Sequence, residues 1–82
     1  MTRGPDPSVS TLELLSFFAE SSDPAFVAKE VANEYDKTRQ WADRRLKEIE
    51  EMGYLKSKNP GGRARIYWLT EAGELRLSEG AD

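Results

Sequence analysis

The chain has 82 residues and a formal net charge of −3, and it contains neither cysteine nor histidine. This length suits one small domain. The lack of cysteine excludes disulfides and thiolate chemistry, and the lack of histidine removes the commonest general base and metal ligand. No apolar run reaches the roughly 18 residues of a membrane span, and no signal segment opens the chain. We therefore expect a cytoplasmic protein without a metal or another cofactor.

The charge is distributed unevenly along the chain. Residues 1–35 carry −4, residues 36–68 carry +4 and residues 69–82 carry −3. A basic middle between acidic ends predicts an anionic partner at one face of the molecule. Chance clustering of charges on a solvated surface is the alternative interpretation.

The chain opens with two prolines and a glycine within residues 1–7, which predicts a flexible leader before a domain over residues 8–82. The sequence STLE, starting at Ser10, is typical of a capping box and predicts a helix that continues to about Glu20. The apolar residues of this helix cover a wider arc than a single surface stripe needs. We expect most of them in the core, with part of the helix free to face a second subunit.

The sequence SSDP ends the first helix. Asp23 can cap the next helix with Pro24 at its first position. Alternatively, Phe26 lies in a short extended segment and the helix starts near Val27. In both cases the apolar spacing predicts a second helix that ends near Tyr35.

A third helix is predicted over residues 38–52, with Thr38 as its N-cap and Gly53 directly after its end. Its core-facing residues fall within about 120° of arc, and they are Ala42, Leu46, Ile49 and Met52. Long polar side chains occupy the opposite side, at Gln40, Arg44, Lys47 and Glu51.

A hairpin is predicted from strands over residues 54–58 and 63–69, which are joined by the Asn-Pro-Gly-Gly turn at residues 59–62. We expect Tyr67 and Leu69 to point inward.

A last helix is predicted over residues 71–79, with Thr70 as its cap. Gly73 weakens this helix, and Ala72 and Leu75 form its apolar side, with Leu77 off that line.

Two short helices joined by a tight turn, with long polar side chains on the outer face of the second, predict a helix-turn-helix. The second helix of this motif enters the major groove of DNA, where arginine can bind guanine and glutamine can bind adenine. The residues expected to contact base edges or a phosphate are Thr38, Arg39, Gln40, Asp43, Arg44 and Lys47.

The hairpin that follows has the features of a DNA-binding wing. Gly61 and Gly62 allow close approach of the backbone, and the flanking cations can bind the phosphate backbone or enter the minor groove. These cations are Lys56, Lys58, Arg63 and Arg65. The expected fold is therefore α+β, a winged helix-turn-helix with a three-helix core, a two-stranded β-hairpin wing and a short C-terminal helix.

The sequence AKEVANEYDKTRQWADRRLKEIEEMGYL resembles the helix-turn-helix of winged-helix transcription regulators of the MarR and PadR type. IYWLTEAGE resembles their last strand and the start of the helix after it. The chain also resembles small phage-repressor-like proteins of halophilic archaea. The resemblance implies a homodimer that binds palindromic operators in double-stranded DNA, often as a repressor. Asp36 and Lys37 depart from the usual glycine and apolar residue of the turn, and Trp41 is larger than the usual residue.

A second subunit would contact exposed apolar residues, and the candidates for this dimer interface are Leu14, Phe17, Trp68, Leu75 and Leu77. Trp68 has an equally good alternative position under the last helix. The chain has no room for a separate effector domain, so we expect no small-molecule effector site.

Several alternatives stay open. Arg44 and Lys47 could pair with neighbouring acids on a solvated helix, whereas Arg45 is expected to pack or pair inward. Trp41 is expected to pack on the core, with stacking on DNA or a partner as the alternative. A winged helix can also act as a protein-interaction module in a larger assembly. No residue pattern suggests an enzyme.

Overall fold

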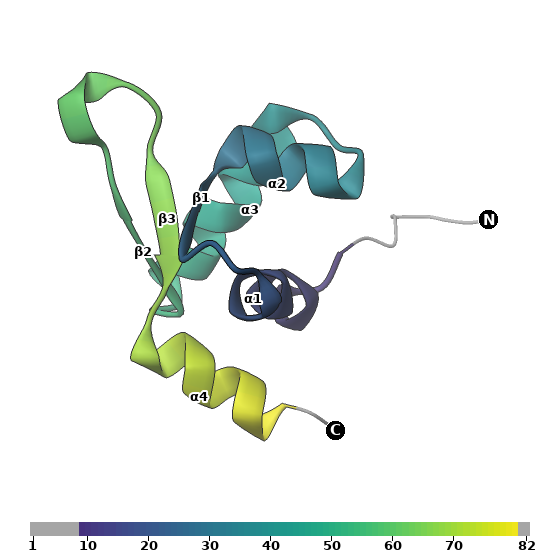
Figure 1. Cartoon of the computed structure of the whole chain (residues 1–82). Coiled ribbons are helices and arrows are strands. Elements are labelled where there is room, and N and C mark those ends of the chain that lie inside the picture. Colours follow the sequence, from purple (N-terminus) through teal and green to yellow (C-terminus); the bar gives the residue numbers. More distant parts are fainter. Residues whose placement is uncertain (1–8, 81–82) are drawn as a thin grey trace.

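The computed structural model describes residues 9–80, so the expected leader over residues 1–7 lies outside the described residues. The chain has the α+β winged helix-turn-helix fold, with three helices packed on one face of a small sheet and a fourth helix after it (Figure 1). In chain order the elements are α1 (Thr11–Glu20), β1 (Ala25–Val27), α2 (Ala28–Tyr35), α3 (Arg39–Glu51), β2 (Leu55–Lys58), β3 (Ile66–Leu69) and α4 (Glu71–Glu79).

Three helices begin at the hydroxyl caps that the sequence predicts. The Ser10 Oγ accepts a hydrogen bond from the backbone N–H of Glu13 at 3.0 Å. Thr38 and Thr70 accept equivalent bonds, each also 3.0 Å long, at the starts of α3 and α4. Each cap satisfies one of the backbone donors that the first turn of a helix leaves without a partner.

The second helix starts after a short strand, as the alternative interpretation expected, and the cap at Asp23 with Pro24 in the helix was wrong. Ala25–Val27 forms β1, which pairs antiparallel with β3, so its backbone groups are already used in the sheet. The backbone N–H of Val27 donates to the Glu30 carboxylate at 3.0 Å and fixes the start of α2.

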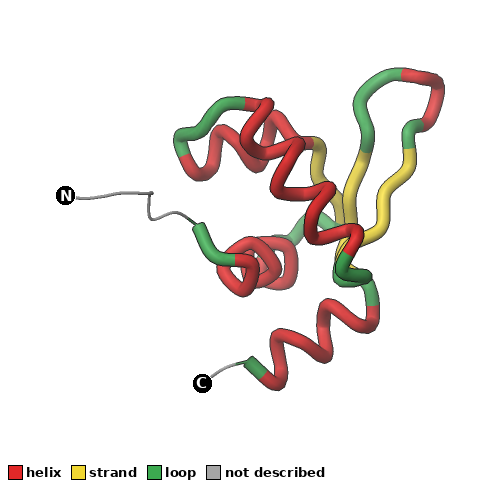
Figure 2. The backbone as a smooth tube through the Cα atoms, turned by 180° about the vertical axis from the view of Figure 1, so that it is seen from behind, coloured by secondary structure: helices red, strands yellow, loops and turns green. Residues whose placement is uncertain are grey.

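The hairpin belongs to a three-stranded sheet with the order β1-β3-β2, rather than standing alone as a two-stranded wing. Its second strand begins at Ile66, three residues later than expected. Pro60–Gly62 forms one 3-10 turn at the tip, where Gly61 and Gly62 have φ of +68° and +72°. Both views show this tip projecting beyond the helices (Figures 1 and 2). The wing is therefore anchored at its base and free at its tip.

The core lies between the inner face of the sheet and the first three helices, and Tyr67 is among its largest fully buried side chains. Its buried members are Leu14, Leu15, Phe18, Phe26, Ala28, Val31, Ala32, Ala42, Leu46, Ile49, Leu55 and Tyr67. Met52 was expected in this core, but its side chain is 54% exposed. The buried row of α3 ends at Ile49, because the chain turns toward β2 at Gly53, where φ is +90°.

The last helix packs through a different side from the one predicted. Ala72 and Leu75 are exposed, whereas Gly73 is buried and Leu77 packs against the core. A Cβ atom at Gly73 would collide with the carbonyl oxygen of Tyr54, so the missing side chain allows α4 to approach the start of β2. The pattern of apolar side chains predicted the wrong packing face for α4, because the backbone at Gly73, and not an apolar side chain, makes the contact with Tyr54.

Candidate nucleic-acid interface

The turn between α2 and α3 is short and hydrogen-bonded. Asp36 adopts a left-handed conformation, with φ 56° and ψ 45°, which aspartate tolerates better than most residues. The backbone N–H of Lys37 donates to the carbonyl of Ala32 at 2.9 Å. Aspartate thus takes the role of the expected glycine, and α3 follows α2 as in a helix-turn-helix.

The outward face of α3 carries most of the predicted base-reading residues. Arg39, Gln40, Arg44 and Lys47 are exposed there, after the Thr38 cap. Asp43 differs, because it is half-buried and accepts a hydrogen bond from the Tyr67 hydroxyl at 3.4 Å. Lys47 forms an exposed ion pair with the same carboxylate at 3.6 Å, as the solvated-helix alternative allowed. Asp43 therefore faces partly toward the sheet.

The four wing cations divide between the two faces of the hairpin. Tyr67 points inward, so its strand neighbours Ile66 and Trp68 point outward. Lys56 lies opposite Trp68 and Lys58 opposite Ile66, which places both lysines on the outer face. The two arginines, Arg63 and Arg65, lie on the side of α3, where they line a groove with Arg39.

Two polar contacts connect the wing to α3. Arg65 Nη1 donates to the Ser57 Oγ at 3.0 Å, and this hydroxyl donates to Glu50 Oε2 at 2.8 Å. The second contact is the hydrogen bond between Tyr67 and Asp43. Burial, followed by the negative charges of Asp43 and Glu50, raises the pKa of Tyr67 to about 12, so its hydroxyl stays a donor at neutral pH. These contacts fix the base of the wing relative to α3.

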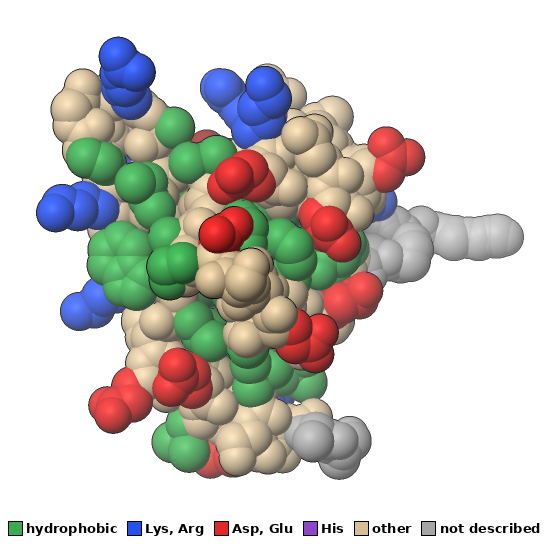
Figure 3. Space-filling model, viewed as in Figure 1, with side chains coloured by type: hydrophobic (Ala, Val, Ile, Leu, Met, Phe, Trp, Pro, Cys, Tyr) green, Lys and Arg blue, Asp and Glu red, His purple; other side chains and the backbone are tan. Residues whose placement is uncertain are grey.

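A groove of about 400 Å³ lies between the wing, the start of α2 and the start of α3. It is lined by Val27, Ala28, Lys29, Arg39, Asp43, Arg63, Ala64 and Arg65. In Figure 3, lysine and arginine side chains gather along the wing and at the top of the molecule, whereas many acidic ones lie to the right and at the bottom. Lys29 was not predicted as a site residue, because only its position at the start of α2, next to β1, brings it to the wing.

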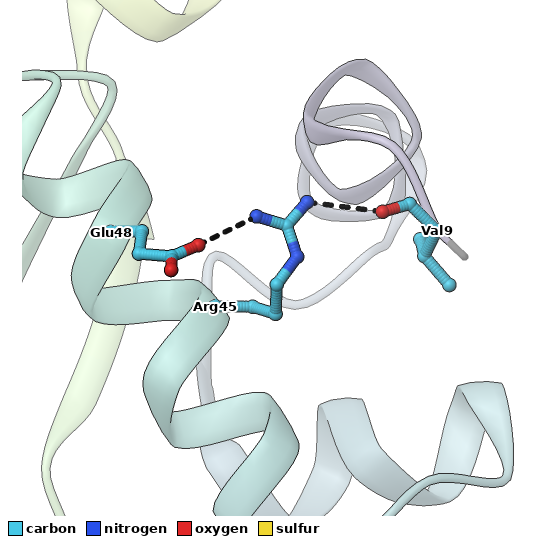
Figure 4. Close-up of polar contacts among 3 residues, drawn as sticks. All are labelled: Val9, Arg45 and Glu48. Atoms are coloured by element: carbon cyan, nitrogen blue, oxygen red, sulfur yellow. Dashed lines mark hydrogen bonds and ion pairs between the residues drawn. The ribbon is translucent and has the colours of Figure 1, made fainter. Parts of the chain in front are cut away.

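Arg45 points away from this surface, as expected. Its guanidinium donates to the Val9 carbonyl and to the Glu48 carboxylate, each at 3.0 Å, and so connects α3 to the residue before the Ser10 cap of α1 (Figure 4). Trp41 is half-buried against the core, and the Lys37 ammonium lies 5.8 Å from the centre of its ring. The expected packing role of Trp41 is confirmed.

The predicted dimer-interface residues have different exposures. Leu14 is fully buried in the core of its own chain, so the structure contradicts its assignment to an interface. Phe17 and Leu77 are partly buried against that core, and Leu75 is 59% exposed. Trp68 is half-buried and lines a hollow of about 520 Å³ with Phe18 and Glu74, among others. Leu75 is therefore the most exposed of these apolar candidates.

Within residues 9–80, no helix is both long enough and apolar enough to cross a membrane. The same part of the chain holds no group of three or more acidic side chains that could bind a metal ion.

No protein-family model matches the sequence, and no curated protein matches it either. A solved crystal structure of a MarR family transcription regulator is similar to the chain, with a TM-score of 0.63 and 22% sequence identity. The similarity covers 79% of this chain and 43% of the regulator, so the chain spans less than half of the length of that protein. At this level of identity the comparison supports the fold alone, the winged helix described above.

Proposed function

We propose that the chain binds double-stranded DNA in a sequence-specific manner and acts as a transcription regulator. In this proposal α3 enters the major groove, where Gln40 and Arg44 contact base edges and Arg39, at the start of the helix, contacts a base edge or a phosphate. The tip of the wing lies on the phosphate backbone or in the minor groove, where Arg63 contributes positive charge. Thr38, Lys47 and Arg65 complete the contact surface, with Asp43 at its edge.

The observation that carries the proposal is a cluster of cations between the wing and the starts of α2 and α3 in an acidic protein. Lys29, Arg39, Arg63 and Arg65 line one groove, and this groove contains these four cations against one acid, Asp43. A protein-interaction module of the same fold does not need such a concentration of charge. The similar solved structure supports the same proposal, because that protein is a MarR family transcription regulator.

The test is an NMR titration of the labelled protein with random-sequence double-stranded DNA at low salt. We expect chemical-shift changes concentrated at residues 38–47 and 56–65. A salt series should then give a binding constant that falls as salt rises, because phosphate contacts release counterions. A folded protein that shows no shifts in either segment would contradict DNA binding and favour a protein partner at the face of Trp68.

A matched pair of variants makes the test specific. Arg44→Gln removes an exposed cation from α3, and Arg76→Gln removes a half-buried cation from α4, so each variant changes the net charge equally. We expect only Arg44→Gln to weaken DNA binding and to change the sequence preference. An equal loss in both variants would show attraction by net charge without a docked helix.

We also propose that the chain works as a cytoplasmic homodimer and that the dimer represses transcription. The dimer interface would include Trp68 and Leu75, with Phe17 and Leu77 contributing their exposed edges. Sedimentation equilibrium of the wild type and of Trp68→Ala tests this proposal, with a monomeric variant as the expected result. A wild type that stays monomeric at high concentration, with and without DNA, would contradict it.

A further inference from the structure

We propose that the groove between the wing and the starts of α2 and α3 is a discrete phosphate-binding site, and that Lys29 is one of its ligands. The inference rests on the proposed function, because the phosphate would belong to the DNA backbone. It adds a residue from α2 and defines where on the surface one phosphate group is held.

The first argument is the convergence of cations from three elements. Lys29 comes from the first turn of α2, Arg39 from the first turn of α3, and Arg63 and Arg65 from the wing. All four line one groove, whose volume is about 400 Å³. Positive side chains around an open groove repel one another, so a bound phosphate dianion or diester lowers the energy of this arrangement.

The second argument is that Asp43, the single acid in the groove, already has other partners. Asp43 accepts the Tyr67 hydroxyl at 3.4 Å and pairs with Lys47 at 3.6 Å. Among the described residues, the ion pairs are Arg45 with Glu48 and Lys47 with Asp43, so neither involves a cation of the groove. The positive charge of the groove is therefore available to a ligand.

The third argument is the positioning of Arg65. The Ser57 hydroxyl accepts from Arg65 Nη1 at 3.0 Å and donates to Glu50 at 2.8 Å. This contact uses one of the five N–H donors of the guanidinium and leaves the others for a phosphate. Ser57 thus acts as a positioning residue, which holds Arg65 at the groove without touching the ligand.

The outer face of the same hairpin supplies the control. Lys56 is exposed, lies opposite Trp68 and does not line the groove, although it belongs to the same wing. Replacing Lys56 or Lys29 by glutamine removes the same charge from the protein. A discrete site distinguishes these two substitutions, whereas general attraction by net charge does not.

The experiment has two parts. The first is an NMR titration of the full chain with inorganic phosphate against chloride at equal ionic strength. We expect shifts at Lys29, Arg39, Ala64 and Arg65 that are specific to phosphate, that are lost in Lys29→Gln and that are kept in Lys56→Gln. The second part measures DNA affinity over a salt series. Lys29→Gln should lower the affinity by about 5-fold and reduce the salt slope by about one.

Ser57 is tested by a conservative rescue. Ser57→Ala should weaken phosphate binding and broaden the Arg65 side-chain signal, and Ser57→Thr, which keeps the hydroxyl, should restore both. Phosphate binding without DNA binding would leave the site standing and remove the proposed function. Shifts spread evenly over all exposed cations, or equal effects of Lys29→Gln and Lys56→Gln, would overturn the site even if DNA binds.

Discussion

Replacing Gly73 by alanine tests the packing of α4, because helix propensity and packing predict opposite effects at this position. Gly73 lies inside α4 and has no positive φ, so alanine fits its backbone conformation. Propensity alone predicts that Gly73→Ala stabilises the protein by about 1 kcal/mol. The sequence suggests this outcome, because it presents Gly73 as a weak point of the helix.

The structure predicts the reverse. The new Cβ would collide with the carbonyl oxygen of Tyr54 and lie 2.8 Å from Leu69 Cδ1. The Leu69 side chain can move, but the Tyr54 carbonyl is held because it accepts the backbone N–H of Thr70 at 3.0 Å. Overpacking costs about 1–3 kcal/mol, and loss of the hydrogen bond adds about 1 kcal/mol. After subtraction of the propensity gain, the free energy of unfolding should fall by roughly 1–3 kcal/mol.

Urea denaturation of both proteins measures this difference directly. In a domain of this size each kcal/mol corresponds to a change in melting temperature of about 4–8 °C. Ser78→Ala is the control, since Ser78 is exposed in the same helix and gains propensity without a new contact. A Gly73→Ala variant as stable as the wild type would refute the close approach of α4 to Tyr54.

The remaining predictions concern caps, arginines and pH. Thr38→Ala should lower the free energy of unfolding by about 1 kcal/mol in urea denaturation, and Thr38→Ser should not. Arg45→Ala should cost about 1 kcal/mol of stability by releasing the Val9 carbonyl and the Glu48 carboxylate, whereas Arg44→Ala should weaken DNA binding with unchanged stability. Burial raises the pKa of Tyr35 and Tyr67 from 10.0 to about 12. Because the folded protein favours the neutral form of both tyrosines, the stabilisation that the neutral hydroxyls provide should be complete below pH 10 and lost between pH 10 and 12. Urea midpoints over this pH range would measure the loss.

The sequence predicted the features that depend on a few adjacent residues. Ser10, Thr38 and Thr70 are caps because a hydroxyl stands directly before a helical pattern, and all three caps are confirmed. Gly53 likewise follows the end of α3 with a positive φ. Such signals act within one turn of a helix, so no knowledge of the tertiary structure is needed to read them.

The features that were missed depend on contacts between distant segments. β1 has only three residues and no alternation of its own, and its partner in β3 follows about 40 positions later. Gly73 is required by the backbone at Tyr54, which no propensity scale contains. Lys29 reaches the candidate site only because β1 places the start of α2 beside the wing. For β1 and Lys29 the missing information was the pairing of β1 with β3, and for Gly73 it was the close approach of α4 to Tyr54.

The four cations of the hairpin have two different physical roles. Arg63 and Arg65 border the groove beside α3, where positive charge attracts an anionic ligand. Lys56 and Lys58 stand on the outer face of β2, which is an edge strand of the sheet. Lysines on an exposed edge oppose pairing with the edge of another molecule. An acidic protein can therefore place four cations on one hairpin because two of them serve the proposed ligand and two keep the sheet from extending.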